Sequence, residues 1–232
     1  MQFFIIVLVI CLVLFLFRLY HLGNDDLVLL KKNITLETVF NSAFIVALIA
    51  LFSARLGFVI LHLSPLYENI LGFFLFPYFP GLSLTGGVVG GSLSLLFLSK
   101  TKKFPIGRVF DFFSMSFLFI MPIGIIGYLI LSRDITIGNL TRLILYTIAL
   151  IASNIYLLPK ASVLELKNGS LTLLFLIFYS LISLLTISID NPGISYFINH
   201  RENFVLLAIL IIALILIFKQ EIIGKVPQRN GR

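Results

Sequence analysis

Long apolar stretches, separated by short polar segments, repeat along the whole chain. Most of them approach the roughly 20 residues that a helix needs to cross the hydrocarbon core of a bilayer. A backbone in lipid must satisfy its own hydrogen bonds, and the pattern lacks the short alternating strands of a membrane barrel. The sequence therefore predicts an all-α integral membrane protein, a bundle of seven transmembrane helices at approximately 1–17, 39–63, 82–99, 110–131, 140–158, 171–189 and 204–218. We expect residues 1–232 to form a single transmembrane domain.

The composition excludes most other classes of protein. Of the 232 residues, 59% are apolar and 12% are charged, whereas a soluble domain has about 45–50% apolar and about 25% charged residues. This is too little charge to cover a water-facing surface, which argues against a soluble enzyme, a disordered chain or a nucleic-acid module. With one cysteine, Cys11, and three widely separated histidines, the sequence predicts no disulfide within the chain, no metal site and no cofactor.

The positive charges indicate the orientation of the bundle. If seven spans alternate, thirteen of the seventeen Lys and Arg residues fall on one side of the membrane and three on the other, with Arg55 inside a span. Cytoplasmic segments carry the excess of Lys and Arg, so the N-terminus is predicted outside and the C-terminus in the cytoplasm. The net charge of +7 is thus interpreted as a topology signal and not as a nucleic-acid surface.

Three segments need a separate interpretation. Residues 1–17 lack the basic start and the cleavage site of a signal peptide, so we expect a permanent span there. The predicted external segment 64–84 reads SPLYENILGFFLFPYFPGLSL and holds three prolines, which forbid one continuous helix. It fits either a re-entrant or interfacial loop at the outer leaflet or an apolar connection packed on the bundle. The polar cytoplasmic segment 18–38 is a candidate for a short interfacial helix.

One charge, Arg55, lies within an apolar stretch. An arginine at the centre of a span costs about 2.5–3.5 kcal/mol on insertion scales and is a functional candidate by default. It either extends to the outer headgroups or binds a lipid phosphate through its planar guanidinium. We expect its side chain to point into the bundle, toward Gly86 and Gly87. These two belong to a run of four glycines, with Gly90 and Gly91, which permits close helix packing or exposes N–H groups to a phosphate.

An ordered set of motifs resembles the prolipoprotein diacylglyceryl transferase family. The motifs are, in chain order, Ala54-Arg55-Leu56-Gly57-Phe58, Leu82-Ser83-Leu84-Thr85-Gly86-Gly87-Val88-Val89-Gly90, the basic Lys102-Lys103-Phe104-Pro105, Asp111 and Gly124-Ile125-Ile126-Gly127. The resemblance implies seven spans in the bacterial cytoplasmic (inner) membrane. It also implies transfer of diacylglyceryl from phosphatidylglycerol to the lipobox cysteine of prolipoproteins. Phosphatidylglycerol and prolipoprotein signal peptides would then be the partners. No nucleic-acid partner is expected.

The chain departs from the family at the positions that matter for chemistry. The family's His-Gly-Gly has Thr85 in place of the histidine, its Gly-Arg-x-Gly-Asn has Ile125 in place of the arginine, and the arginine of its sixth span falls at Ser183. No catalytic residue is therefore assigned. The resemblance implies a phospholipid-binding role for Arg55, Gly57, Gly86 and Gly87, and a structural role for Gly90, Gly91, Gly124 and Gly127.

Three functions follow from these observations. The first is the family reaction, in which a base must deprotonate the thiol and cations must stabilise the leaving phosphate. Thr85 is no base at neutral pH, and His62 is either a displaced base or a polar ring at the interface. The second function is an inactive homologue that binds phospholipid or signal peptide. The third, a small transporter subunit, lacks support because no ionisable residue except Arg55 is expected deep in a span.

Overall fold

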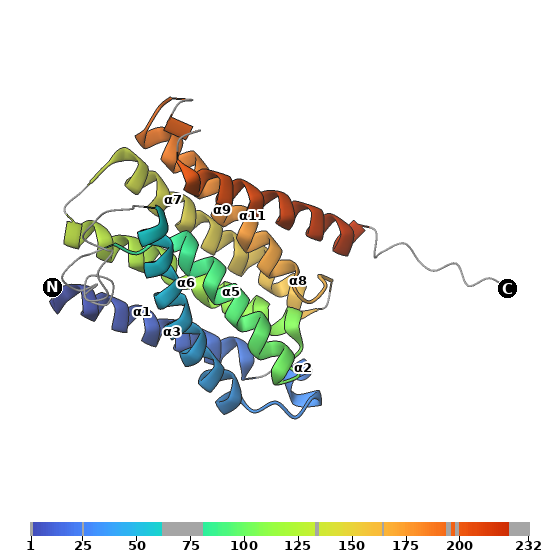
Figure 1. Ribbon diagram of the computed structural model, residues 1–232. Coiled ribbons are helices and arrows are strands. Elements are labelled where there is room, and N and C mark those ends of the chain that lie inside the picture. Colours follow the sequence, from blue (N-terminus) through green and yellow to red (C-terminus); the bar gives the residue numbers. More distant parts are fainter. Residues whose placement is uncertain are drawn as a thin grey trace.

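The described part of the molecule is entirely helical in its regular structure, which confirms the all-α class (Figure 1). The computed structural model describes residues 2–24, 26–61, 81–132, 135–163, 165–193, 196–197 and 200–222. Its helices are α1 (Gln2–Gly23), α2 (Leu27–Lys31), α3 (Leu36–Leu61), α5 (Leu84–Thr101), α6 (Ile106–Ser132), α7 (Ile137–Ala152), α8 (Leu158–Ser162), α9 (Ser170–Asp190) and α11 (Arg201–Ile217). A π-helical turn, Ser153–Leu157, joins α7 to α8, and another, Phe218–Ile222, follows α11.

Within the described residues, six helical segments are long and apolar enough to cross a membrane, namely Phe3–Gly23, Leu36–Leu61, Ile106–Ser132, Ile137–Ser162, Ser170–Asp190 and Arg201–Glu221. The 18-residue α5, which carries the four glycines, is the seventh helix of the bundle. The long helices run roughly along one common direction (Figure 1). The short helix α2 lies in the segment where the sequence predicted one.

The helices extend beyond the predicted spans at most of their ends. The prediction ended the first span before Arg18, yet α1 continues to Gly23. Arg18 is accommodated because its guanidinium donates a hydrogen bond to the Asn154 side chain and lies 5.7 Å from the centre of the Phe119 ring. Of the predicted loop 64–84, only residues 81–84 are described, so the choice between a re-entrant loop and a packed connection lies outside the described residues.

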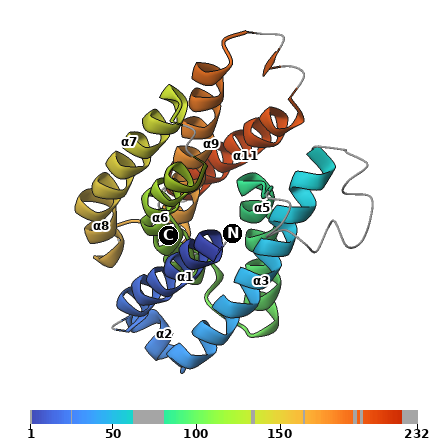
Figure 2. The same ribbon diagram turned by 90° about the vertical axis from the view of Figure 1, so that its left-hand side faces the viewer.

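Helix α6 occupies the centre of the bundle (Figure 2). It packs against α1, α5, α7 and α9, and its residues Val109 and Leu118 have no exposed surface. Helix α3 pairs with α5, and α9 pairs with α7 and α11. At one end of the bundle, α3 and α9 end while α5, α7 and α11 begin. We call this the site end, and the opposite end, which holds Lys100 and Lys102, the basic end.

Helices α3 and α5 run antiparallel at unusually short distance because glycine replaces larger side chains between them. A Cβ atom built on Gly57 would stand 3.0 Å from Cα of Gly86, and one on Gly86 would stand 2.7 Å from the carbonyl oxygen of Ser53. One turn further along α5, a Cβ atom on Gly90 would overlap the Ser53 side chain. This is the close backbone approach that small residues permit between membrane helices.

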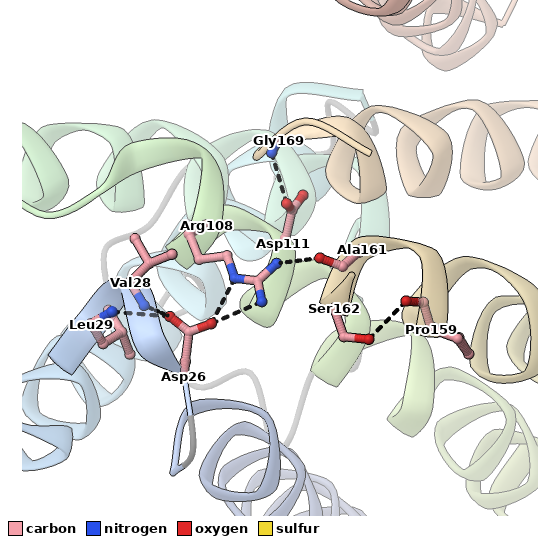
Figure 3. Close-up of polar contacts among 9 residues, drawn as sticks. All are labelled: Asp26, Val28, Leu29, Arg108, Asp111, Pro159, Ala161, Ser162 and Gly169. Carbon is pink, nitrogen blue, oxygen red and sulfur yellow. Dashed lines mark hydrogen bonds and ion pairs between the residues drawn. The ribbon is translucent and has the colours of Figure 1, made fainter. Parts of the chain in front are cut away.

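An ion pair fastens the basic end of the bundle (Figure 3). The Asp26 carboxylate accepts the N–H groups of Val28 and Leu29 at 3.0 Å and so caps α2. Its other oxygen lies 2.8 Å from Nη2 of Arg108, on α6, and Nη1 of Arg108 donates to the carbonyl of Ala161, on α8. Because the Asp26 and Arg108 side chains are only 3% and 12% exposed, the pair ties α2, α6 and α8 together in a shielded setting.

A second carboxylate, Asp111, fixes the start of α9 on α6 at the same end. It accepts the N–H group of Gly169 at 2.7 Å, and both the N–H and the hydroxyl of Thr172 at 2.9 Å. Gly169 has φ of +102°, a left-handed conformation that favours glycine. These hydrogen bonds satisfy N–H groups at the beginning of α9, so the role of Asp111 is structural.

Candidate functional site

Arg55 lies near the end of α3 and points into the protein. Its side chain is 3% exposed, its Nη1 donates to the carbonyl of Gly81 at 2.9 Å, and its guanidinium carbon lies 5.9 Å from the centre of the Phe58 ring. A backbone carbonyl is therefore one of its partners. The buried guanidinium brings a fixed positive charge to the site end.

Ser83 connects Arg55's helix to the glycine run. Its N–H donates to the carbonyl of Ala54 at 2.9 Å, and its hydroxyl accepts the N–H of Gly86 at 3.1 Å as the cap of α5. The N–H of Gly87 donates to the Ser83 carbonyl at 3.0 Å. Both glycine amides are thus engaged in the cap, and these glycines act on the site by setting the distance between α3 and α5.

Thr85 is the centre of a buried hydrogen-bond chain. It is 4% exposed, and its hydroxyl donates to Oε1 of Glu202, at the start of α11, over 2.6 Å. Its oxygen lies 2.9 Å from the hydroxyl of Tyr179, on α9. Since the Thr85 hydroxyl has one proton, Tyr179 is the donor to Thr85 and Thr85 the donor to Glu202. The position of the family histidine therefore holds a threonine that is bonded to a carboxylate.

A second cation, Arg142, extends the polar cluster along α7 and α9. Its Nε and Nη2 donate to the Thr186 hydroxyl at 3.3 and 3.1 Å. One turn further into the bundle on both helices, the hydroxyl of Tyr146 lies 3.5 Å from that of Ser183. The predicted span 140–158 already included Arg142 near its beginning, and in the structure Arg142 lies in the second turn of α7, which begins at Ile137.

An apolar cavity of about 340 Å³ lies among α1, α3, α5 and α6. Ala54, Ser83 and Gly87 line it at the site end, and side chains such as Val46, Leu95 and Phe113 line it deeper in the bundle. Its wall is almost wholly hydrocarbon, so it suits an acyl chain better than a polar solute. Cys11 also lines this cavity, half-buried on α1.

The remaining residues predicted from sequence lie elsewhere. Gly124 and Gly127 face α1, where a Cβ atom on Gly127 would stand 2.5 Å from the Val7 side chain. Ile125 packs in the hydrophobic core among α6, α7 and α9. His62 lies outside the described residues. Within the part of the chain that the structure describes, no three metal-ligating side chains come together.

The sequence did not identify Glu202 or Arg142 as site residues, and the reason is the same for both. Both lie in the first two turns of their helices, close to predicted span boundaries, where charged residues are normal and carry no signal. Only the packing of α11 and α7 against α5 and α9 brings these charges to the site end. An acidic residue at the start of an otherwise apolar stretch, as in Arg201-Glu202-Asn203, is the sole hint that the sequence offers.

A bundle of helices long and apolar enough to cross a membrane defines a multi-pass membrane protein, here with a buried arginine near an apolar cavity. The match of residues 2–219 to the family model described as prolipoprotein diacylglyceryl transferase makes this class specific. The chain belongs to the prolipoprotein diacylglyceryl transferase family. No curated protein sequence gives a significant match to it.

Proposed function

We propose that the protein transfers a diacylglyceryl group from phosphatidylglycerol to the lipobox cysteine of prolipoproteins in the bacterial inner membrane. Its N-terminus would face outward and its C-terminus the cytoplasm, as the distribution of Lys and Arg predicts. The observation that carries the proposal is the buried guanidinium of Arg55, whose chain neighbour Ala54 lines an apolar cavity. Together they match the charged and the hydrocarbon parts of an anionic phospholipid.

In this proposal Arg55 binds the lipid phosphate. A guanidinium offers donors in a planar fork that matches two phosphate oxygens, and the contact with the Gly81 carbonyl fixes its direction. Gly57, Gly86 and Gly87 contribute to the phospholipid site by letting α5 approach α3, where Ser83 bonds the carbonyl of Ala54, the chain neighbour of Arg55. An acyl chain then occupies the cavity among α1, α3, α5 and α6.

The reaction forms one carbon–sulfur bond and breaks one carbon–oxygen bond. The thiolate of the lipobox cysteine attacks the glyceryl carbon that bears the phosphate. The electron pair of the broken bond leaves with glycerol phosphate, which goes from one negative charge to two. Cations that face this developing charge lower the barrier, and Arg55 is placed to do so, with Arg142 as a second cation at the site end.

A binder without turnover is the second candidate, favoured by the absence of the family's histidine at Thr85 and of its arginine at Ile125. Complementation separates the two functions: the intact chain is expressed in a bacterial strain depleted of its own prolipoprotein diacylglyceryl transferase. We expect growth and lipidated prolipoprotein with the wild type, and neither with Arg55→Lys, since a point charge lacks the planar two-pronged contact. Growth failure of a folded wild type that retains phosphatidylglycerol through purification would favour the binder.

A further inference from the structure

Glu202, at the start of α11, is a carboxylate that contacts Ser83 and Thr85, the residues just before the glycine run of α5. Its Oε1 accepts the Thr85 hydroxyl at 2.6 Å and lies 3.5 Å from the Ser83 hydroxyl. Ser83 lines the apolar cavity. The carboxylate therefore stands where the polar end of a lipid in that cavity would meet a second substrate.

The hydrogen bonds leave this carboxylate ready to accept a proton. Tyr179 donates a hydrogen bond to Thr85, and Thr85 donates one to Oε1 of Glu202. This series of hydrogen bonds therefore ends on one carboxylate oxygen only. Oε2 accepts no hydrogen bond from the described residues, and the side chain is half-buried, not sealed. A carboxylate that is held by one oxygen and open at the other has the form of a general base.

Among the described residues, the charged and titratable groups near Glu202 come from α3, α7, α9 and α11. On α3, Arg55 follows Ala54, whose carbonyl accepts the N–H of Ser83. Tyr179 on α9 is linked to Glu202 through Thr85, and Arg142 of α7 acts electrostatically on the same tyrosine. On its own element, Arg201 precedes it and is exposed. His200, two residues before it, has its Nε2 3.0 Å from the Tyr196 hydroxyl and is the one competing base near the start of α11 in the described structure.

We propose that Glu202 is the proton acceptor for the substrate thiol, in the place that the family's histidine leaves empty at Thr85; this rests on the proposed transferase function. The thiol proton passes to Oε2 of Glu202 as sulfur attacks the glyceryl carbon. The carbon–oxygen bond breaks, and glycerol phosphate leaves with its electron pair. The proton then returns to solvent. Thr85 is a positioning residue that holds Oε1 and so directs Oε2 toward the thiol.

The test is the pH profile of transfer from phosphatidylglycerol vesicles to a lipobox peptide by the reconstituted full-length protein. At pH 7, Glu202→Gln should lower the rate by about 10²–10⁴-fold, the usual contribution of a general base. A free cysteine thiol has pKa about 8.5, so the peptide supplies roughly tenfold more thiolate per pH unit below that value. The rate of the variant should rise accordingly with pH, and its deficit against wild type should shrink by a similar factor.

Three variants make the test specific. Glu202→Asp keeps a carboxylate and should retain the wild-type pH profile at a lower rate. Glu221→Gln removes a carboxylate that accepts hydrogen bonds from Ser170 and Lys167 at the basic end, away from the site. Any loss of transfer rate in this variant should therefore be the same at every pH. His200→Gln tests the competing base and should leave the profile unchanged.

Each outcome bears on a different claim. If wild type transfers nothing, the proposed function fails. Suppose that the wild type is active. If Glu202→Gln then keeps the wild-type pH profile and rate, or if its rate is as low as that of Glu202→Asp at every pH, the assignment of the base is wrong. The transferase function stands in either case. A profile altered by His200→Gln instead would transfer the role to His200. If Glu202→Gln fails to fold, an unaltered profile in Glu202→Asp supports the proposal and a lost one overturns it.

Discussion

Replacing Gly86 by alanine should destabilise the contact between α3 and α5. The added methyl group would stand 2.7 Å from the Ser53 carbonyl oxygen and 3.2 Å from Cα of Gly57. Both neighbours are backbone atoms, so the clash is relieved only if the two helices move apart. Such overpacking typically costs about 1–3 kcal/mol, against a gain of up to about 1 kcal/mol from alanine in a helix. We expect the free energy of unfolding to fall by about 1–2 kcal/mol.

The adjacent Gly87→Ala is the matched control. Its methyl group would lie 3.4 Å from Cβ of Ala54, which is ordinary van der Waals contact. Both changes carry the same helix-propensity gain, so their difference isolates the clash. The measurement is equilibrium unfolding of the detergent-solubilised proteins, followed by helical circular dichroism. Equal stability of the two variants, or a more stable Gly86→Ala, would refute the close approach of α3 and α5 as the reason for glycine at this position.

Three further predictions follow from the same contacts. Arg108→Gln should lower the free energy of unfolding by about 3–5 kcal/mol, because it leaves the Asp26 carboxylate buried without its ion partner; a double variant with Asp26→Asn should recover part of the loss, and its failure to do so would argue against the pair. Arg142→Gln should reduce transfer by about 10²-fold while phospholipid still co-purifies, because a cation facing the developing phosphate charge is lost; an unchanged rate would limit Arg142 to a structural role. In a cysteine-free background, a cysteine at Ile135 should react with an impermeant reagent in intact cells and one at Lys102 should not, and the reverse result would invert the topology.

The sequence alone predicts the helices well because membrane spans depend on one strong variable. Apolar length identifies all seven helices, including α5, whose glycines reduce its hydropathy. The ends are less well predicted: Arg18 suggested a boundary, but a hydrogen bond to Asn154 keeps it within α1. Such a contact joins residues more than 100 positions apart and has no local signature.

Only part of the candidate site can be predicted from the sequence. Arg55 is detectable because a charge inside an apolar stretch is costly, and the glycine run is detectable by its composition. Glu202 and Arg142 carry no such cost at helix starts. They join the site only because of helix packing. Helix α11 lies beside α5, so Glu202 bonds Thr85, and α7 lies beside α9, so Arg142 bonds Thr186. Interhelical neighbours of this kind depend on the packing and not on the pattern of apolar residues.

The most direct measurement of the central claim follows the diacylglyceryl group itself. Phosphatidylglycerol with isotope-labelled acyl chains is placed in vesicles with the purified protein and a lipobox peptide, and the peptide is analysed by mass spectrometry. The account predicts a peptide whose cysteine gains the labelled diacylglyceryl mass, with one glycerol phosphate released per peptide, and no gain when that cysteine is replaced by serine. An unmodified peptide, with labelled phosphatidylglycerol recovered intact on a folded protein, would contradict the account.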